Sequence, residues 1–294
     1  VTDETGLMLS LHNWGGMGFT GAPDPGVLCK RYNVICIGVD YLQSGEGAPP
    51  ESGFPYDTGY LQTLDALRGL FYVYHGLQKN HITFDATRLY ATGGSGGGNV
   101  SLMANKLAPN TFACIVDLSG LASLTDDIAF GSPELTEVRA GYSRELDHPN
   151  YLSADAQMIR DPGCPTHIDV MMAAGNTALI VCIHGEDDKS CCVTDKRRVM
   201  NALKSAGADV QAHYMSQSDI DGDLIMDSGH GIGDRTHLLQ HFADSYLLPD
   251  GPDMCRLKEP CNFESGRAVC FPTEQGEYVI DYSMGYPEAK FQIR

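Results

Sequence analysis

The sequence predicts an α/β fold in which a mostly parallel sheet is flanked by helices. Two observations support this prediction. Short apolar runs rich in β-branched residues alternate along the chain with segments of helical periodicity, and glycine-rich or polar turns separate the two kinds of segment. The chain has 294 residues, 43% of them hydrophobic, which is enough for one large core.

Six apolar runs have the length and composition of strands. The first, residues 6–11, leads into a glycine-rich loop. The second, residues 33–41, is rich enough in β-branched residues to predict a strand buried on both faces. A polar loop rich in glycine and proline follows it, from Gln43 to Pro55. The remaining strands are expected over residues 87–92, 112–118, 178–183 and 209–215.

Helical periodicity appears between these strands. The longest predicted helix, from Asp57 to Leu77, has an acidic start and then leucine and aromatic residues at helical spacing. Shorter helices are expected over residues 99–107, about 194–206 and about 236–247. A strand, a helix and a second strand in succession form a crossover, so the order of elements favours parallel pairing.

Two regions interrupt the alternation of strands and helices. Residues 120–165 contain no clear strand and many polar residues, and we expect them to form a cap insertion within a domain that spans residues 1–250. Residues 251–294 contain strand-like runs at 268–271, 278–282 and 290–293, separated by cysteines and turn residues. We expect this tail to form a small β-rich C-terminal appendage.

The composition narrows the classes of partner. A net charge of −18 excludes nucleic acids and anionic membrane surfaces as partners, because both would repel the chain. The same negative charge has two interpretations: it keeps the chain in solution, or it attracts cationic substrates. No apolar run is long enough to span a membrane. The chain begins at Val1 without the basic start and apolar run of a signal peptide, so we expect a processed or trimmed product.

The ten cysteines fall into three groups. Three lie in predicted buried strands, where thiols behave as small apolar groups, four lie in predicted loops, and three lie in the C-terminal tail. We expect one or two disulfides if the compartment is oxidising, although spacing does not give their pairing. In chain order the groups are Cys36, Cys114 and Cys182; Cys29, Cys164, Cys191 and Cys192; and Cys255, Cys261 and Cys270.

The strongest functional signal is Ser95 in the sequence Gly-Gly-Ser-Gly-Gly, between a predicted strand and a predicted helix. In this context the pattern G-x-S-x-G indicates a nucleophile elbow, a turn so tight that flanking side chains would clash. Such a turn exposes the serine hydroxyl and directs the backbone N–H of Gly96 at a developing oxyanion. The glycines do not match the phosphate-binding patterns G-x-x-x-x-G-K-[ST] or G-x-G-x-x-G.

Two later segments supply a candidate acid and a candidate base. The strand at 178–183 leads into His184-Gly-Glu-Asp-Asp188, and Ser228-Gly-His230-Gly follows the last strand. Together with the serine turn, these segments resemble the prolyl oligopeptidase-like branch of the α/β-hydrolase superfamily, which is related to dienelactone hydrolases and esterases. The resemblance covers roughly residues 6–249 and implies a catalytic triad of Ser95, Asp188 and His230. Asp187 is the alternative acid, and His184 is structural in this pattern.

A second oxyanion donor is expected from the loop that follows the first strand. His12-Asn13-Trp14-Gly15-Gly16 resembles the HGGG-type loop of the same superfamily, and this implies the Trp14 amide as donor, with Asn13 or Gly15 as alternatives. The β-hairpin that usually begins this fold is missing from the N-terminus. Either the chain is trimmed, or the C-terminal tail supplies those strands.

The expected function is therefore that of a serine hydrolase that acts through an acyl-enzyme. We expect a carboxylesterase acting on a small or carbohydrate-linked ester, with a prolyl oligopeptidase-like peptidase and a non-catalytic binding protein of the same fold as alternatives. The mechanism requires no metal or organic cofactor. Asp219, Asp221 and Asp223 alternate as calcium ligands do, but the rest of an EF-hand loop is missing, so an acidic turn is the better interpretation.

Overall fold

The computed structural model describes residues 1–45, 53–131 and 136–294. Parts of the predicted loop 43–55 and of the predicted cap insertion 120–165 therefore lie outside the described residues. The described chain contains a parallel sheet of six strands in the order β2-β1-β3-β4-β5-β6, which confirms the predicted fold class. The strands are β1 (Gly6–Leu11), β2 (Val34–Ile37), β3 (Leu89–Gly94), β4 (Cys114–Leu118), β5 (Leu179–Gly185) and β6 (Val210–Met215).

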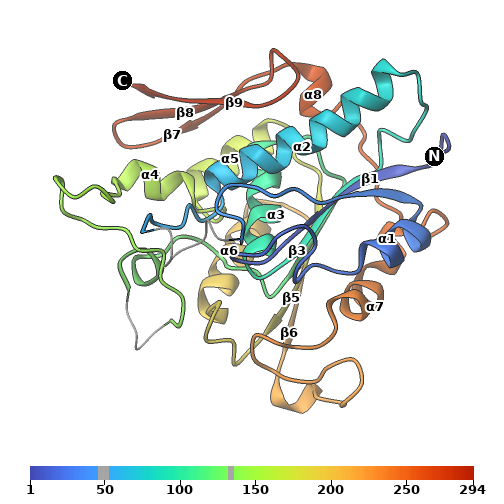
Figure 1. Ribbon diagram of the computed structural model, residues 1–294, viewed down its shortest axis with the longest axis horizontal. Helices are drawn as coiled ribbons and strands as arrows, with labels where there is room; N and C mark the ends of the chain where they lie inside the picture. The colour runs from blue at the N-terminus through green and yellow to red at the C-terminus, as the bar shows by residue number, and fades with distance from the viewer. Residues whose placement is uncertain (46–52, 132–135) are drawn as a thin grey trace.

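Helices cover both faces of this sheet (Figure 1). On one face α1 (Pro25–Tyr32) contacts α7 (Arg235–Leu247). On the other face α2 (Tyr60–Lys79) packs on α3 (Gly96–Leu107), α3 on α5 (Pro165–Ala173), and α5 on α6 (Val193–Ser205). The central strands β1, β3, β4 and β5 are buried along their whole length, which explains their largely apolar sequences.

Two local predictions were wrong at the edge of the sheet. β2 spans only four residues and is half-buried in its middle, because it is an edge strand with a single neighbour, β1. The helix α1 was not predicted, and Cys29 lies in it rather than in a loop. Asp24 caps this helix by accepting the backbone N–H groups of Gly26 and Val27, and proline occupies its first position.

The C-terminal tail forms a separate antiparallel sheet of β7 (Val269–Pro272), β8 (Gly276–Asp281) and β9 (Glu288–Ile293), after the short helix α8 (Asn262–Ser265). It lies beside α2 and α5 (Figure 1), where Arg68 donates to the carbonyl of Pro287. The tail adds no strand to the described parallel sheet, so the idea that it replaces the leading hairpin was wrong.

The predicted insertion contains a π-helical turn (Asp127–Gly131) and α4 (Ala154–Ile159). Its apolar residues form a second, smaller hydrophobic cluster on which Trp14 packs. All ten cysteines are free thiols, so the expected disulfides are absent from the structure. The Cys114 thiol of β4 and the Cys255 thiol of the tail instead lie close together. No described helix has both the length and the apolarity needed to cross a membrane.

Candidate active site

Ser95 lies at the junction of β3 and α3, in the turn that the sequence predicts. Its backbone has φ 57° and ψ −119°, a left-handed conformation that is unfavourable for a residue with a side chain. The turn is fixed by neighbouring backbone, since the Ser95 amide donates to the Leu118 carbonyl at 3.0 Å and the Ser95 carbonyl accepts from the Leu121 amide at 3.1 Å. The serine is thus held in a strained turn at the carboxyl end of a central strand.

Asp188 and His230 form a hydrogen-bonded pair. Asp188 follows β5 and is buried, and its Oδ2 accepts from His230 Nδ1 at 2.8 Å. Its Oδ1 accepts the backbone N–H groups of Ser190 at 2.9 Å and Cys191 at 2.8 Å, which fixes the carboxylate in place. A carboxylate held in this way fixes the tautomer of the imidazole and leaves Nε2 as a base.

The alternative acid, Asp187, occupies a different environment. Its side chain is exposed and accepts from the hydroxyl of Ser228 at 2.6 Å and the amide of Gln217 at 2.8 Å. Hydrogen bonds from Ser228 and then Gln217 lower the pKa of Asp187. Asp187 therefore holds the loop that carries His230, whereas Asp188 contacts the imidazole itself.

Cys191 links Ser95 to the Asp188–His230 pair. Its thiol is buried and lies close to the Ser95 side chain, and burial, followed by the nearby Asp188 charge, raises its pKa. Ligand atoms of Asp188, Cys191 and His230 all lie within 4.8 Å of one another. The structure thus brings Ser95, Asp188 and His230 together around this thiol. The sequence places Cys191 and Cys192 just after the predicted acid, where two loop thiols are favoured over a vicinal disulfide, and both are free. Sequence alone gave Cys191 no role at the site, because its closeness to Ser95 depends on the fold.

The expected oxyanion donors, Gly96 and Trp14, also meet. A Cβ atom added to Gly96 would lie 2.8 Å from the Trp14 nitrogen, so the two backbones are in close contact and residue 96 has to be glycine. Within the described chain, neither amide donates to another protein group. The alternative donor Asn13 is occupied, because its amide donates to the Thr20 carbonyl at 3.0 Å.

A buried network of charged and polar groups supports the loop after β5. Lys196 and Asp117 form an ion pair in which both side chains are fully buried. His184 Nε2 donates to the Cys191 carbonyl at 2.6 Å, and burial lowers the pKa of His184 to about 4, so its ring is neutral at pH 7. His184 is therefore structural, as the resemblance implies.

Arg235, at the start of α7, also packs on the elbow. Its guanidinium fills the space that a side chain at Gly94 would occupy, and it donates to the Gly21 carbonyl. The sequence does not indicate which side chain packs against Gly94, because that contact depends on the fold. Arg235 was accordingly not predicted.

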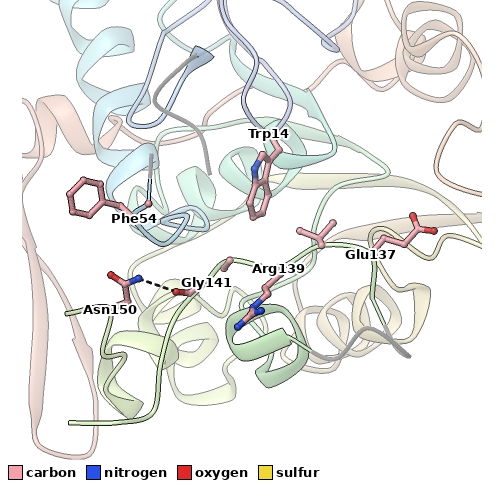
Figure 2. Close-up of a pocket in the computed structure, with 9 residues that line it drawn as sticks. Trp14, Phe54, Glu137, Arg139, Gly141 and Asn150 are labelled. Atoms are coloured by element: carbon pink, nitrogen blue, oxygen red, sulfur yellow. Dashed lines mark hydrogen bonds between the residues drawn. The ribbon is translucent and has the colours of Figure 1, made fainter. Parts of the chain in front are cut away.

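A cavity of about 560 Å³ lies beside the loop that carries Trp14. Figure 2 shows the Trp14 indole pointing into it from one side, with residues 137–141 on the other. The indole stacks on Tyr56 with ring centroids 3.5 Å apart and an interplanar angle of 12°. The side chains of Glu137 and Arg139 lie at the border of the cavity, and Asn150 donates to the Gly141 carbonyl at 3.3 Å (Figure 2).

Metal-binding geometry is confined to one cluster in the described ranges. Asp188, Cys191 and His230 are the only three such side chains there whose ligand atoms converge. The acidic run at 219–223 is exposed, and Asp221 accepts the amides of Asp223 and Ile225 at 2.9 Å, as an acidic turn does.

Comparison with known proteins places the sequence in a family. The family model described as "Protein of unknown function (DUF2920)" matches residues 45–245, more than half of the chain. The chain belongs to this DUF2920 family. The DUF2920 match includes Ser95, Asp188 and His230, whereas Trp14 lies outside it. No curated protein matches the sequence.

Solved structures share the α/β-hydrolase fold of this DUF2920 chain. An acylaminoacyl peptidase of Pyrococcus horikoshii has a TM-score of 0.58 and 16% identity, and the match covers 84% of this chain and 38% of that one. A Mycobacterium tuberculosis puromycin-hydrolyzing peptidase has a TM-score of 0.55 and 16% identity, with 83% and 34% covered. Oligopeptidase B of Leishmania major has a TM-score of 0.51 and 15% identity, with 84% and 32% covered. The chain thus spans about a third of the length of each of them.

Proposed function

We propose that this chain is a serine hydrolase with Ser95 as nucleophile, His230 as base and Asp188 as the residue that orients the base. The observation that carries the proposal is the strained turn at Ser95, which lies close to the Cys191 thiol and so beside the hydrogen-bonded Asp188–His230 pair. Strained backbone at a serine costs stability, and a nucleophile elbow is a well-known reason for it.

The proposed reaction proceeds in two halves. Ser95 Oγ attacks the substrate carbonyl carbon while His230 Nε2 takes the hydroxyl proton, and the N–H groups of Trp14 and Gly96 stabilise the oxyanion. The bond to the leaving group then breaks, His230 returns the proton to the leaving group, and an ester on Ser95 remains. Water attacks this ester by the same route and releases the acid. Asp188 holds the imidazolium that forms in each half.

The sequence favours an ester as substrate, but the solved structures support the peptidase alternative, because the three compared above are all peptidases. We therefore propose an acyl-amide bond as the natural substrate. The cavity beside Trp14 suits an apolar side chain next to that bond, since the indole, Val138 and Ala140 line it.

Parallel assays with short p-nitrophenyl esters and aminoacyl anilides test this proposal. A peptidase hydrolyses both, and Ser95→Ala abolishes both activities while the fold is retained by circular dichroism. Hydrolysis of esters alone would return the assignment to a carboxylesterase. No hydrolysis of either class would favour the non-catalytic binding protein. A decrease in the hydrolysis of cationic anilides as salt rises would show that the acidic surface attracts them.

A further inference from the structure

Cys191 lies among the proposed triad residues, but the proposed reaction does not use it. The residue is 2% exposed, and its sulfur lies close to Ser95, the His230 imidazole and the Asp188 carboxylate. A buried thiol usually packs among apolar groups. Cys191 belongs to the second hydrophobic cluster, but its sulfur also lies within 4.8 Å of the ligand atoms of Asp188 and His230.

The geometry points to a zinc-binding site formed by Cys191, His230 and Asp188, in which the bound ion inhibits the enzyme. Sulfur, imidazole nitrogen and carboxylate oxygen are the three ligand types that Zn²⁺ prefers. Their atoms lie within 4.8 Å of one another, whereas a tetrahedral site places ligand atoms roughly 3.3–3.7 Å apart. Movements of about 1 Å therefore close the site, and the Ser95 hydroxyl or a water completes the coordination.

Access and charge both favour such an ion. His230 is 29% exposed, so a hydrated cation reaches it from solvent. The ion binds as the Cys191 thiol loses its proton to solvent, and the thiolate and carboxylate together neutralise its two charges. Hard cations such as Mg²⁺ prefer oxygen ligands and octahedral geometry, so the site selects thiophilic divalent ions.

Inhibition follows from the lone pair that the metal takes. The imidazole cannot accept the Ser95 proton while its nitrogen is bound to zinc. In addition, the Asp188 oxygen that binds the ion no longer orients the imidazole. This inhibitory effect rests on the proposed function. The binding itself does not, and it can be measured on a protein with no activity at all.

The test is a titration of chelator-treated protein with ZnCl₂ by calorimetry, for wild type, Cys191→Ala and Cys192→Ala. Cys192 is the matched control, because it is the adjacent thiol and lies outside the cluster. We expect one site per chain, affinity lower by about 100-fold in Cys191→Ala, and affinity within about threefold of wild type in Cys192→Ala. Co²⁺ should give a thiolate charge-transfer band that only Cys191→Ala lacks.

The outcomes separate the two proposals. Zinc binding that is equal in wild type and Cys191→Ala, or no binding at all, overturns the metal site even if hydrolysis is observed. Cys191-dependent binding in a protein that hydrolyses nothing supports the metal site and removes the hydrolase assignment. In an active protein, hydrolysis should fall as the site fills and return with chelator. Activity that rises with zinc would contradict inhibition. Circular dichroism of each variant checks that a loss of binding is not a loss of folding.

Discussion

The α-carbon of Gly97 lies directly against the carbonyl oxygen of Leu11, so that a methyl group on residue 97 would overlap the backbone of β1. The contact joins the helix after Ser95 to the strand that precedes the Trp14 loop. It explains why this turn requires glycine beyond the positions that flank Ser95.

Gly97→Ala is expected to destabilise the protein by about 1–3 kcal/mol, because backbone cannot move aside as a side chain can. Activity should fall as well, since the displaced strand leads to Trp14. Urea unfolding provides the measurement. Gly76→Ala is the control, because a Cβ there meets nothing within 4 Å and adds helix propensity. It should stabilise the protein by up to about 1 kcal/mol, and equal effects in the two variants would contradict the close contact.

Asp188→Asn is expected to lower kcat by about 10³–10⁴-fold with little change in KM, because an amide at this position favours the wrong imidazole tautomer. Asp187→Asn changes only the exposed bonds to Ser228 and Gln217 and should cost less than about tenfold. Steady-state kinetics of the two variants decide whether Asp188 or Asp187 is the acid that orients His230. A larger loss in Asp187→Asn would reassign the acid.

The neutral, buried His184 gives the fold a predictable dependence on pH. Burial lowers the pKa of His184 in the folded protein to about 4, against an ordinary value of 6.5. The unfolded chain therefore takes up this proton first as pH falls. Stability is retained above about pH 6.5 and lost between about 6.5 and 4, by on the order of 3 kcal/mol.

Unfolding free energies measured across this pH range test the His184 prediction. The slope should be shallower in His184→Gln than in wild type, because the substituted side chain does not titrate. His241→Gln, on the exposed face of α7, should keep the wild-type slope. Parallel curves for wild type and His184→Gln would show that another group governs the acid transition.

Lys196→Met should destabilise the fold by about 3–5 kcal/mol, because it leaves the Asp117 carboxylate buried without its partner. The next residue offers the control. Arg197 pairs with Glu186 at the surface, where both side chains are more than a third exposed, and Arg197→Gln should cost about 1 kcal/mol or less. Thermal and urea unfolding give both values, and comparable losses would mean that the buried pair contributes no more than the exposed one.

The sequence was sufficient to predict the central strands and the serine turn. β1, β3, β4 and β5 are buried on both faces, and complete burial favours the short, largely apolar runs from which they were predicted. The strand-turn-helix context of Ser95 is likewise local. The edge strand β2 and the helix α1 were harder to predict. The burial of an edge strand is only partial, and a helix of eight residues shows little hydrophobic periodicity.

The parts of the site that were missed depend on contacts between distant segments. Lys196 binds Asp117, which is 79 residues away in the sequence, and Arg235 binds Gly21, which is 214 residues away. No spacing in the sequence indicates such a pair. Cys191 belongs to the same class, since its importance comes from the Ser95 hydroxyl that the fold places beside it.

The most direct test of the central claim is covalent labelling by a fluorophosphonate probe, followed by digestion and mass spectrometry of the labelled peptide. We expect a single adduct on Ser95, which forms slowly in His230→Ala and is absent in Ser95→Ala. An adduct on another residue, or none on folded wild-type protein, would contradict that claim.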